Sequence, residues 1–355
     1  MADIHENPLG TDGFEFVEFS SDDPKALDAL FTAMGFTAVA KHKTLDITRY
    51  KQGDTNFLVN SSKTGQAADF RKLHGPSANA MAFRVKDAKK AFKLALERGA
   101  KAHTDGVWTD EIPAIYGIGD SVLYLVDKYG EETIYDDLFD PIPGAVDEGG
   151  VGLDVLDHLT HNVYFGNMEK WATFYEDVFN FREIRYFDIK GKHTGLVSKA
   201  MTGPCGKLKI PLNETSDDQS QIAEYLREYK GEGIQHIAMT SANIYETVDK
   251  LRAAGVDLQD TPETYFELID ARLPGHGEDV AALRERRILL DGYSTDNKDL
   301  LLQIFSKTCI GPIFFEFIQR KGNEGFGEGN FQALFESIEL DQVRRGVIKT
   351  DEPAE

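Results

Sequence analysis

Cysteine is scarce in this chain, with Cys205 and Cys309 the only two among 355 residues. They lie far apart and form no CxxC pair, which excludes a disulfide framework. Unpaired, infrequent cysteines are typical of proteins in a reducing compartment, so we expect a cytoplasmic location. Neither thiol is assigned a role.

Long apolar runs and a surplus of basic residues are also missing. No window reaches the roughly 18 consecutive apolar residues of a membrane span, and the opening residues MADIHENPLG lack a signal-peptide pattern. Lys and Arg number 39 against 60 Asp and Glu, a formal net charge of −21. This charge argues against nucleic acids and anionic membranes as partners, and it fits a soluble metabolic protein.

What the sequence does contain is an internal repeat. Residues 81–102 resemble residues 236–258, and residues 13–36 resemble residues 156–181 more loosely. Each stretch predicts a strand and then an amphipathic helix, with several short strands to follow. Four such βαβββ-type units predict an α+β fold of two domains, each a curved, mostly antiparallel sheet with flanking helices.

A loop rich in proline, glycine and acidic residues spans residues 140–152 and separates the two halves. We therefore place a first domain at residues 1–150 and a second domain at residues 151–355. The patterns also predict a strand at residues 132–135 and a helix at residues 217–229.

The C-terminal region combines a buried strand, a glycine-rich turn and a helix. The turn GFGEGNF at residues 325–331 presents two aromatic side chains on a backbone that can bend sharply. We expect a helix at residues 330–345 with Asn330 as its N-cap. The turn would be the hinge of a lid, and the rival interpretation is a fixed helix after a tight turn.

Three potential metal ligands recur at matched positions in the second half. His158 and His236 each lie on a strand that opens a unit, and Glu316 interrupts the apolar strand FFEFI. Their separations are nearly equal, 236 − 158 = 78 and 316 − 236 = 80 residues, so units folded about a pseudo-twofold axis would bring them together. Two histidines and one carboxylate form the facial triad of non-haem Fe(II) oxygenases, which leaves open positions for substrate and O₂.

Each of these residues has a simpler interpretation when taken singly. A lone histidine on an apolar strand is more often a satisfied core residue, and Glu316 alone could pair with an arginine. Their equivalent positions in the repeat favour a shared metal. His161 competes with His158, but residues three apart on a strand point to opposite faces, and the repeat register favours His158.

The first half serves as an internal control. By the same alignment its positions carry Glu15, Met81 and, less securely, Tyr135. This set cannot form a two-histidine site, so we expect the N-terminal domain to be a non-catalytic scaffold.

Several motifs resemble one known family closely. DHLTHNV, SKAM, IPLNE, GIQHIA, LLLQIF, FFEFIQRKG and GFGEGNFQALFESIE look like those of the 4-hydroxyphenylpyruvate dioxygenases, members of the vicinal oxygen chelate superfamily. The resemblance runs from about residue 13 to residue 346. The motif FFEFIQR…GFGEGNF is highly specific, whereas HIA alone is not.

The resemblance implies an Fe(II) ion held by His158, His236 and Glu316. It implies 4-hydroxyphenylpyruvate and O₂ as substrates, homogentisate and CO₂ as products, and a step of tyrosine and phenylalanine breakdown. Because the substrate carries its own 2-oxo acid, which can chelate the ion, no 2-oxoglutarate is needed. A homo-oligomer is also implied, with a tetramer favoured for the bacterial type.

The same resemblance implies a set of substrate-pocket residues with amide, hydroxyl or phenyl side chains. They are Ser198, Asn213, Gln221, Gln235, Gln303, Phe305, Phe326, Asn330 and Phe331. The phenyl rings would clamp the substrate ring, and the uncharged polar groups would orient it. Gln221 could equally lie on a solvated helix face, and Phe331 in the core.

Three alternatives stay open. Hydroxymandelate synthase uses the same triad and substrate but oxidises the benzylic carbon, and Phe305 favours ring hydroxylation instead. Extradiol catechol dioxygenases also use two histidines and a glutamate, but with shorter spacings and without the GFGEGNF motif. A non-catalytic binding protein built from the same units is the third alternative, and the intact ligand set argues against it.

Overall fold

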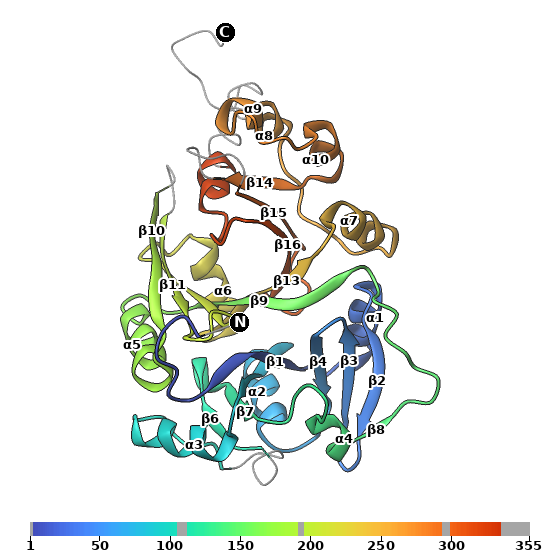
Figure 1. Ribbon diagram of the computed structural model, residues 1–355, viewed down its shortest axis with the longest axis vertical. Coiled ribbons are helices and arrows are strands. Elements are labelled where there is room, and N and C mark those ends of the chain that lie inside the picture. Colours follow the sequence, from blue (N-terminus) through green and yellow to red (C-terminus); the bar gives the residue numbers. More distant parts are fainter. Residues whose placement is uncertain (1–2, 105–111, 191–194, 293–298, 335–355) are drawn as a thin grey trace.

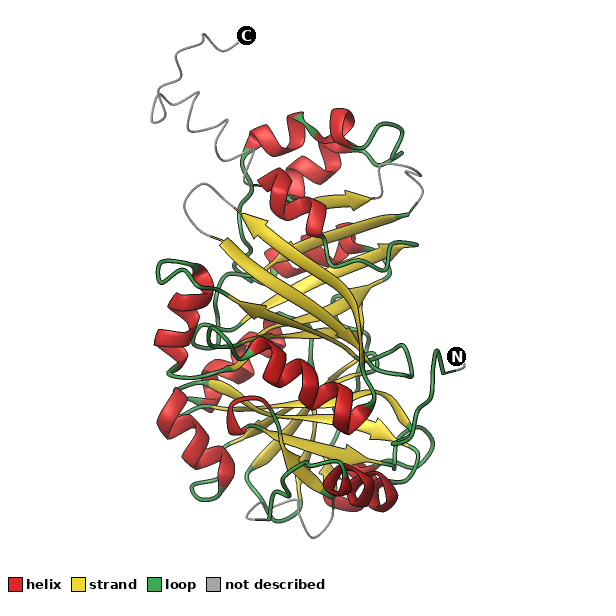
Figure 2. Cartoon of the chain, turned by 90° about the vertical axis from the view of Figure 1, so that its left-hand side faces the viewer, coloured by secondary structure: helices red, strands yellow, loops and turns green. Residues whose placement is uncertain are grey.

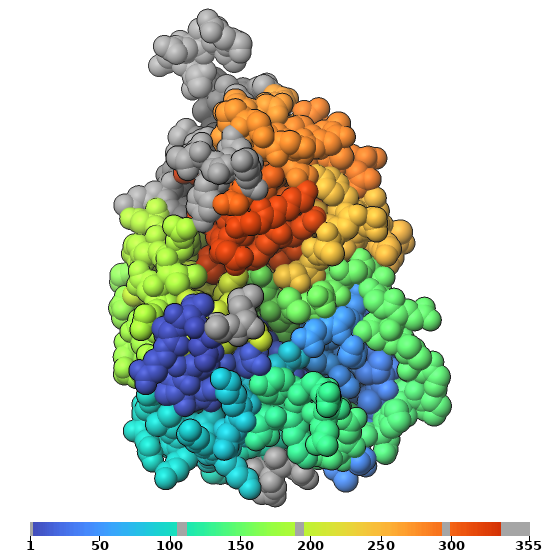
Figure 3. All heavy atoms as spheres, in the orientation of Figure 1, coloured from blue at the N-terminus to red at the C-terminus, as the bar shows by residue number. Residues whose placement is uncertain are grey.

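The computed structural model describes residues 3–104, 112–190, 195–292 and 299–334. Its strands form two eight-stranded sheets, one from each half of the chain, which lie one above the other in Figure 1. Figure 2 shows both sheets from the side, with helices packed around them. The space-filling view in Figure 3 shows the two halves in direct contact.

The N-terminal sheet runs, in spatial order, β6 (Ala114–Tyr116), β7 (Val122–Val126), β5 (Ser77–Val85), β1 (Thr11–Ser20), β4 (Thr55–Asn60), β3 (Ile47–Gln52), β2 (Thr37–His42) and β8 (Phe139–Pro141). The C-terminal sheet runs β14 (Leu289–Gly292), β15 (Leu300–Phe305), β16 (Phe314–Lys321), β13 (Gly233–Ser241), β9 (Leu153–Asn162), β12 (Lys209–Glu214), β11 (Gly195–Thr202) and β10 (Arg182–Lys190). The two orders correspond strand for strand if β8 and β14 are set aside. The predicted α+β fold of two curved sheets built from repeated units is confirmed.

The helices are α1 (Pro24–Ala33), α2 (Gln66–His74), α3 (Ala88–Glu97), α4 (Ile134–Leu138), α5 (Met168–Phe179), α6 (Gln221–Tyr229), α7 (Ile244–Ala253), α8 (Glu263–Glu267), α9 (Ile269–Arg272) and α10 (Val280–Arg286), with a 3₁₀ turn at Ile118–Asp120. Side-chain caps fix several of their starts, because an Asp, Asn or Ser oxygen accepts an otherwise unpaired backbone N–H. The Ser220 hydroxyl accepts from the N–H of Ala223, so α6 begins at Gln221 rather than at the predicted residue 217. Among the described residues, no helix is long and apolar enough to cross a membrane.

Two local predictions are wrong. The predicted strand at residues 132–135 is the start of α4, because Thr133 and Asp136 form a capping box that nucleates a helical turn. Asn330 is not an N-cap, since residues 328–334 are already helical and its side chain is buried. The remainder of the predicted C-terminal helix, residues 335–345, lies outside the described residues.

The centre of the C-terminal sheet contains a β-bulge in β9. Ala238 on β13 pairs with His158, but the next residue, Met239, pairs with Leu156. Asp157 is therefore an extra residue on β9. Bulges re-aim side chains and are frequent beside active sites.

A second bulge lies in β13, the strand that pairs with β9. His161 pairs with Ile234, and the preceding residue, Thr160, pairs with His236. Gln235 is therefore an extra residue on β13. Each of the two histidines in the predicted triad follows a bulged residue directly.

Both bulges recur in the N-terminal sheet, where β1 pairs with β5. The register shifts leave Glu15 and Asn79 as the extra residues. Matched by these shifts, the counterparts of the two histidines are Phe16 and Ala80. The predicted counterparts Glu15 and Met81 are each one residue out of register.

Candidate metal centre

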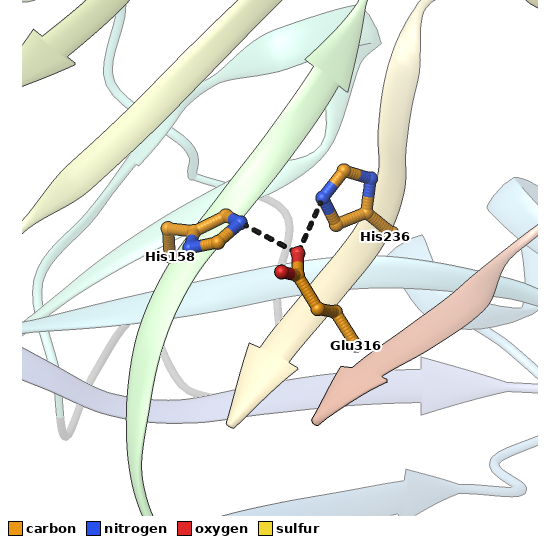
Figure 4. Close-up of side chains that lie close together, drawn as sticks. All are labelled: His158, His236 and Glu316. Carbon is orange, nitrogen blue, oxygen red and sulfur yellow. Dashed lines mark ion pairs between the residues drawn. The ribbon is translucent and has the colours of Figure 1, made fainter. Parts of the chain in front are cut away.

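Three adjacent strands at the centre of the C-terminal sheet carry the predicted triad. His158 lies on β9, His236 on β13 and Glu316 on β16, and Ala238 pairs with both His158 and Glu316. Figure 4 shows the two imidazole rings and the carboxylate pointing toward one another from these strands. The sheet order thus brings together residues from positions about 80 apart in the sequence.

The geometry of the triad suits a single metal ion. The Nε2 atoms of His158 and His236 lie 3.1 Å and 3.3 Å from Oε2 of Glu316, and one ligand atom from each residue lies within 4.8 Å of the others. The side chains of His158 and Glu316 are each 2% exposed. Such a buried group of two imidazoles and a carboxylate, all aimed at one point, fits a divalent cation.

Electrostatics within the cluster favour an ionised Glu316. Burial alone raises the pKa of this carboxyl, but the two histidines outweigh burial and lower it to about 2. Burial lowers the pKa of His158, yet Glu316 and Asp157 together raise it above its usual value. Burial prevails at His236, whose pKa is lowered.

The bulged residues Asp157 and Gln235 contact Nδ1 of the two histidines, the ring nitrogen that does not face Glu316. Oδ1 of Asp157 lies 2.8 Å from Nδ1 of His158, and Oε1 of Gln235 lies 3.0 Å from Nδ1 of His236. A proton on Nδ1 leaves the Nε2 lone pair free to bind a metal. The sequence predicts Gln235 in the substrate pocket and no role for Asp157, because the bulges that turn these side chains toward the rings have no signal in the residue pattern.

His161 lies on the opposite face of β9, as the strand alternation predicts. Its Nε2 is 2.7 Å from the hydroxyl oxygen of Tyr175, and the ring is fully buried. Burial lowers the pKa of His161 to about 3, which keeps the imidazole neutral. It is a core histidine and lies outside the metal cluster.

A cavity of about 370 Å³ opens above the triad. Seven of the predicted pocket residues line it: Ser198, Asn213, Gln221, Gln235, Phe305, Phe326 and Phe331. The ring of Phe326 meets the His158 ring edge to face at 5.3 Å, and Phe305 meets His236 at 6.2 Å. The aromatic wall therefore begins directly at the metal ligands.

Gln303 and Asn330 do not line this cavity. Nε2 of Gln303 donates to Oε1 of Glu316 over 2.8 Å, and Nδ2 of Asn330 donates to Oε1 of Gln303 over 2.7 Å. Oδ1 of Asn330 accepts in turn from the hydroxyl of Tyr265 at 2.6 Å. These residues hold the carboxylate from behind, and they connect it to the helical residues 328–334.

Gly327 makes this arrangement possible. A Cβ atom at this position would lie 1.8 Å from Oε1 of Gln303, and the backbone φ of +77° also disfavours other residues. The glycine-rich turn therefore packs its backbone directly against the amide that supports Glu316. This close contact explains why the turn has a glycine at position 327. The hinge of a lid stays a prediction.

Comparisons with known proteins agree with this geometry. A family model described as "Hydroxyphenylpyruvate dioxygenase, HPPD, N-terminal" matches residues 5–140, and one for the "Glyoxalase/Bleomycin resistance protein/Dioxygenase superfamily" matches residues 155–268. A 4-hydroxyphenylpyruvate dioxygenase from Pseudomonas aeruginosa is 57% identical over 348 residues, which are 96% of this chain and 97% of the relative. This chain belongs to the 4-hydroxyphenylpyruvate dioxygenase family.

One further curated protein and one solved structure are also similar to this chain. A Vibrio vulnificus protein named "Hemolysin VllY" is also 57% identical, over 96% of this chain and 98% of its own length. The solved structure of a mutant 4-hydroxymandelate synthase from Streptomyces coelicolor aligns over 94% of this chain and 100% of that chain, with a TM-score of 0.79 and 24% identity. At that identity the structural match shows the shared fold alone.

Proposed function

We propose that this protein is an Fe(II)- and O₂-dependent dioxygenase that converts 4-hydroxyphenylpyruvate to homogentisate and CO₂. The observation that carries the proposal is the triad of His158, His236 and Glu316 at the end of an aromatic-walled cavity, in a chain of this family. The reaction balances without a second oxo acid, because the substrate itself supplies the carboxylate that leaves as CO₂.

Fe(II) is the metal that we propose for the site. His158, His236 and Glu316 would hold it, and the bound ion would supply the one-electron chemistry with O₂ that a redox-inert ion such as Zn²⁺ lacks. Two neutral imidazoles and one carboxylate leave a divalent site with a net charge of +1, which favours an anionic oxo acid.

The phenylalanines of the cavity would position the aromatic ring of the substrate. Phe305 and Phe326 contact the two histidine rings, so a phenol held between them lies within reach of the metal. Phe331 also lines the cavity and is 39% exposed. Apolar walls also exclude water, which protects a reactive site from side reactions.

Uncharged polar groups would orient the substrate without reacting with it. Ser198 and Asn213 are paired across β11 and β12 and are part of the cavity lining, as is Gln235. Gln221 is exposed at the start of α6 and lines the same cavity. Gln303 and Asn330 would act indirectly, through Glu316, rather than as substrate contacts.

We further propose residues 151–355 as the catalytic domain and residues 1–150 as a scaffold without its own metal. A cytoplasmic location, a role in tyrosine and phenylalanine breakdown, and a homo-oligomer with a tetramer favoured all stay predictions. The absence of nucleic-acid and membrane partners also stays a prediction.

The proposal is tested by anaerobic titration of the metal-free protein with Fe(II) and 4-hydroxyphenylpyruvate, followed by admission of O₂ and product analysis. We expect a charge-transfer band from the oxo-acid chelate and then homogentisate. 4-Hydroxymandelate as product would instead indicate hydroxymandelate synthase. Turnover of a catechol would indicate an extradiol dioxygenase, and a protein that binds no metal would indicate a binding module.

A further inference from the structure

The two histidines of the metal centre differ in what holds them. Both follow a bulged residue that contacts Nδ1, but the contact is a carboxylate for His158 and a neutral amide for His236. A carboxylate accepting the Nδ1 proton increases the electron density on the imidazole and fixes its orientation more strongly than an amide does. His158 is therefore set apart from its partner by Asp157.

Asp157 has a second partner, Arg320, at the end of β16. Nε of Arg320 donates to Oδ2 of Asp157 over 2.8 Å, and Nη2 donates to Oδ1 over 2.7 Å. The side chains of Arg320 and Asp157 are 12% and 6% exposed, so this is a buried, bidentate ion pair. Burial raises the pKa of Asp157, but hydrogen bonds from Arg320 and His158 outweigh burial and hold it well below its usual value.

The remaining nitrogen of Arg320 reaches the glycine-rich turn. Its Nη1 donates to the carbonyl oxygens of Asn323 at 2.9 Å and Gly325 at 2.7 Å. The next residue, Phe326, packs its ring edge to face against the His158 imidazole. One guanidinium thus contacts both the carboxylate behind a metal ligand and the backbone that presents an aromatic wall to the same ligand.

We propose that Asp157 and Arg320 act together as a positioning unit that couples His158 to the turn carrying Phe326. Asp157 accepts the Nδ1 proton of His158 and so presents Nε2 to the metal. Arg320 fixes Asp157 and sets the turn at the distance at which Phe326 closes one side of the cavity. Neither residue lines the cavity, so both act through others. The inference rests on the proposed metal site.

The test uses Co²⁺ as an O₂-stable probe and two variants. Asp157→Asn keeps the size of the side chain but presents an N–H to Arg320 or to His158 in place of an oxygen. We expect Co²⁺ to bind about 10–100-fold more weakly, as for other losses of a partner that holds a metal-binding histidine. Arg320→Lys keeps the buried charge but cannot contact the carboxylate and both carbonyls together, so we expect faster hydrogen exchange across residues 323–326.

Glu15→Gln is the matched control. Glu15 occupies the equivalent bulge in β1 and pairs with Arg84 over 2.6 Å, but no histidine follows it. We expect its Co²⁺ affinity to equal that of the unmodified protein. Circular dichroism establishes that each variant is folded, and Arg320→Lys keeps the test open if Asp157→Asn is not.

The outcomes separate the two proposals. If the unmodified protein binds no Co²⁺, the proposed metal site itself is contradicted. Normal binding by both the unmodified protein and Asp157→Asn would overturn the role of Asp157 alone, and unchanged exchange in Arg320→Lys would overturn the coupling to the turn. Rescue of Co²⁺ affinity by Asp157→Glu would support a requirement for a carboxylate at this position.

Discussion

The two sheets share a frame but differ in what fills them. Their strand orders and both central bulges match. Where the C-terminal sheet has His158 and His236, the N-terminal sheet has Phe16 and Ala80, both fully buried. The difference teaches that the frame supplies positions, and that a few side chains decide whether those positions form a site or a core.

The third ligand position follows the same rule. Ala82 on β5 pairs with Tyr124 on β7, just as Ala238 on β13 pairs with Glu316 on β16. Tyr124 belongs to a buried hydrophobic cluster that also contains Phe16 and Ala80. Tyr135, predicted at this position, comes instead from α4 and packs into the same cluster.

A carboxylate also occupies the N-terminal sheet where the other half opens its cavity. Glu18, 1% exposed, accepts from the side-chain amides of Asn60 at 3.0 Å and Asn79 at 2.6 Å. Asn79 is the bulged counterpart of Gln235, which lines the cavity in the C-terminal sheet. The first half thus satisfies internally the kind of polar group that the second half leaves facing open space.

The largest expected effect is at the ligands. Changing His158, His236 or Glu316 to Ala should abolish turnover, with a loss greater than the roughly 100-fold upper range for an outer-sphere partner. The matched change in the other half, Tyr124→Phe, should leave Co²⁺ affinity and turnover unaltered. Steady-state kinetics and calorimetric Co²⁺ titration measure both. A second metal site in the N-terminal half would show as residual stoichiometric binding in the ligand variants, and would break the comparison.

The second largest effect is expected in the N-terminal sheet, where buried hydrophobic side chains occupy the positions that form the metal site in the C-terminal sheet. Phe16→Ala should lower the free energy of unfolding by about 3–5 kcal/mol, because a large ring is removed from a packed interior. Urea denaturation measures this loss. Metal affinity should stay unchanged under conditions in which the variant is folded, and a parallel loss of metal affinity would contradict the division between the halves.

The pH dependence of stability offers a third contrast. His161 has a counterpart in Phe19, by the register of the bulges, and only the histidine titrates. Its folded pKa of about 3 lies below the unfolded value of 6.5, so the unfolded chain binds the extra proton and stability falls as pH decreases between those values. His161→Gln should make that slope shallower by about 1.4 kcal/mol per pH unit. Urea midpoints between pH 6 and pH 4 measure the slope, and an unaltered slope would refute the assignment.

The smallest expected effect separates two glutamines that each begin the equivalent helix. Gln66, at the start of α2, exchanges hydrogen bonds with Asn79, whereas Gln221, at the start of α6, lines the cavity. Gln221→Ala should raise KM up to about tenfold, the equivalent of one net hydrogen bond of 0.5–1.5 kcal/mol. Gln66→Ala should instead lower stability by a similar energy with KM unchanged. The opposite pattern, a raised KM for Gln66→Ala and a loss of stability for Gln221→Ala, would show that the assignment of Gln221 to the cavity lining is incorrect.

Sequence patterns predicted the repeat, the two sheets and the convergence of the triad, because hydrophobic periodicity and the spacing of motifs are visible in the residues themselves. They did not predict the bulges, since an extra residue alters the strand pairing without altering the composition, and so no role was predicted for Asp157. The capping box at Thr133 was not predicted either, because Thr133, Ile134 and Tyr135 are residue types that favour strands. Gln303 was assigned to the pocket, and only coordinates reveal that its amide faces Glu316.

The contact at Gly327 has a consequence for how this region can change over evolution. Because a single methyl group there would occupy the space of the Gln303 amide, the turn and the strand that bears Gln303 must be inherited as a pair. A transplanted C-terminal segment with a larger residue at position 327 would fit only where the side chain at position 303 leaves that space free.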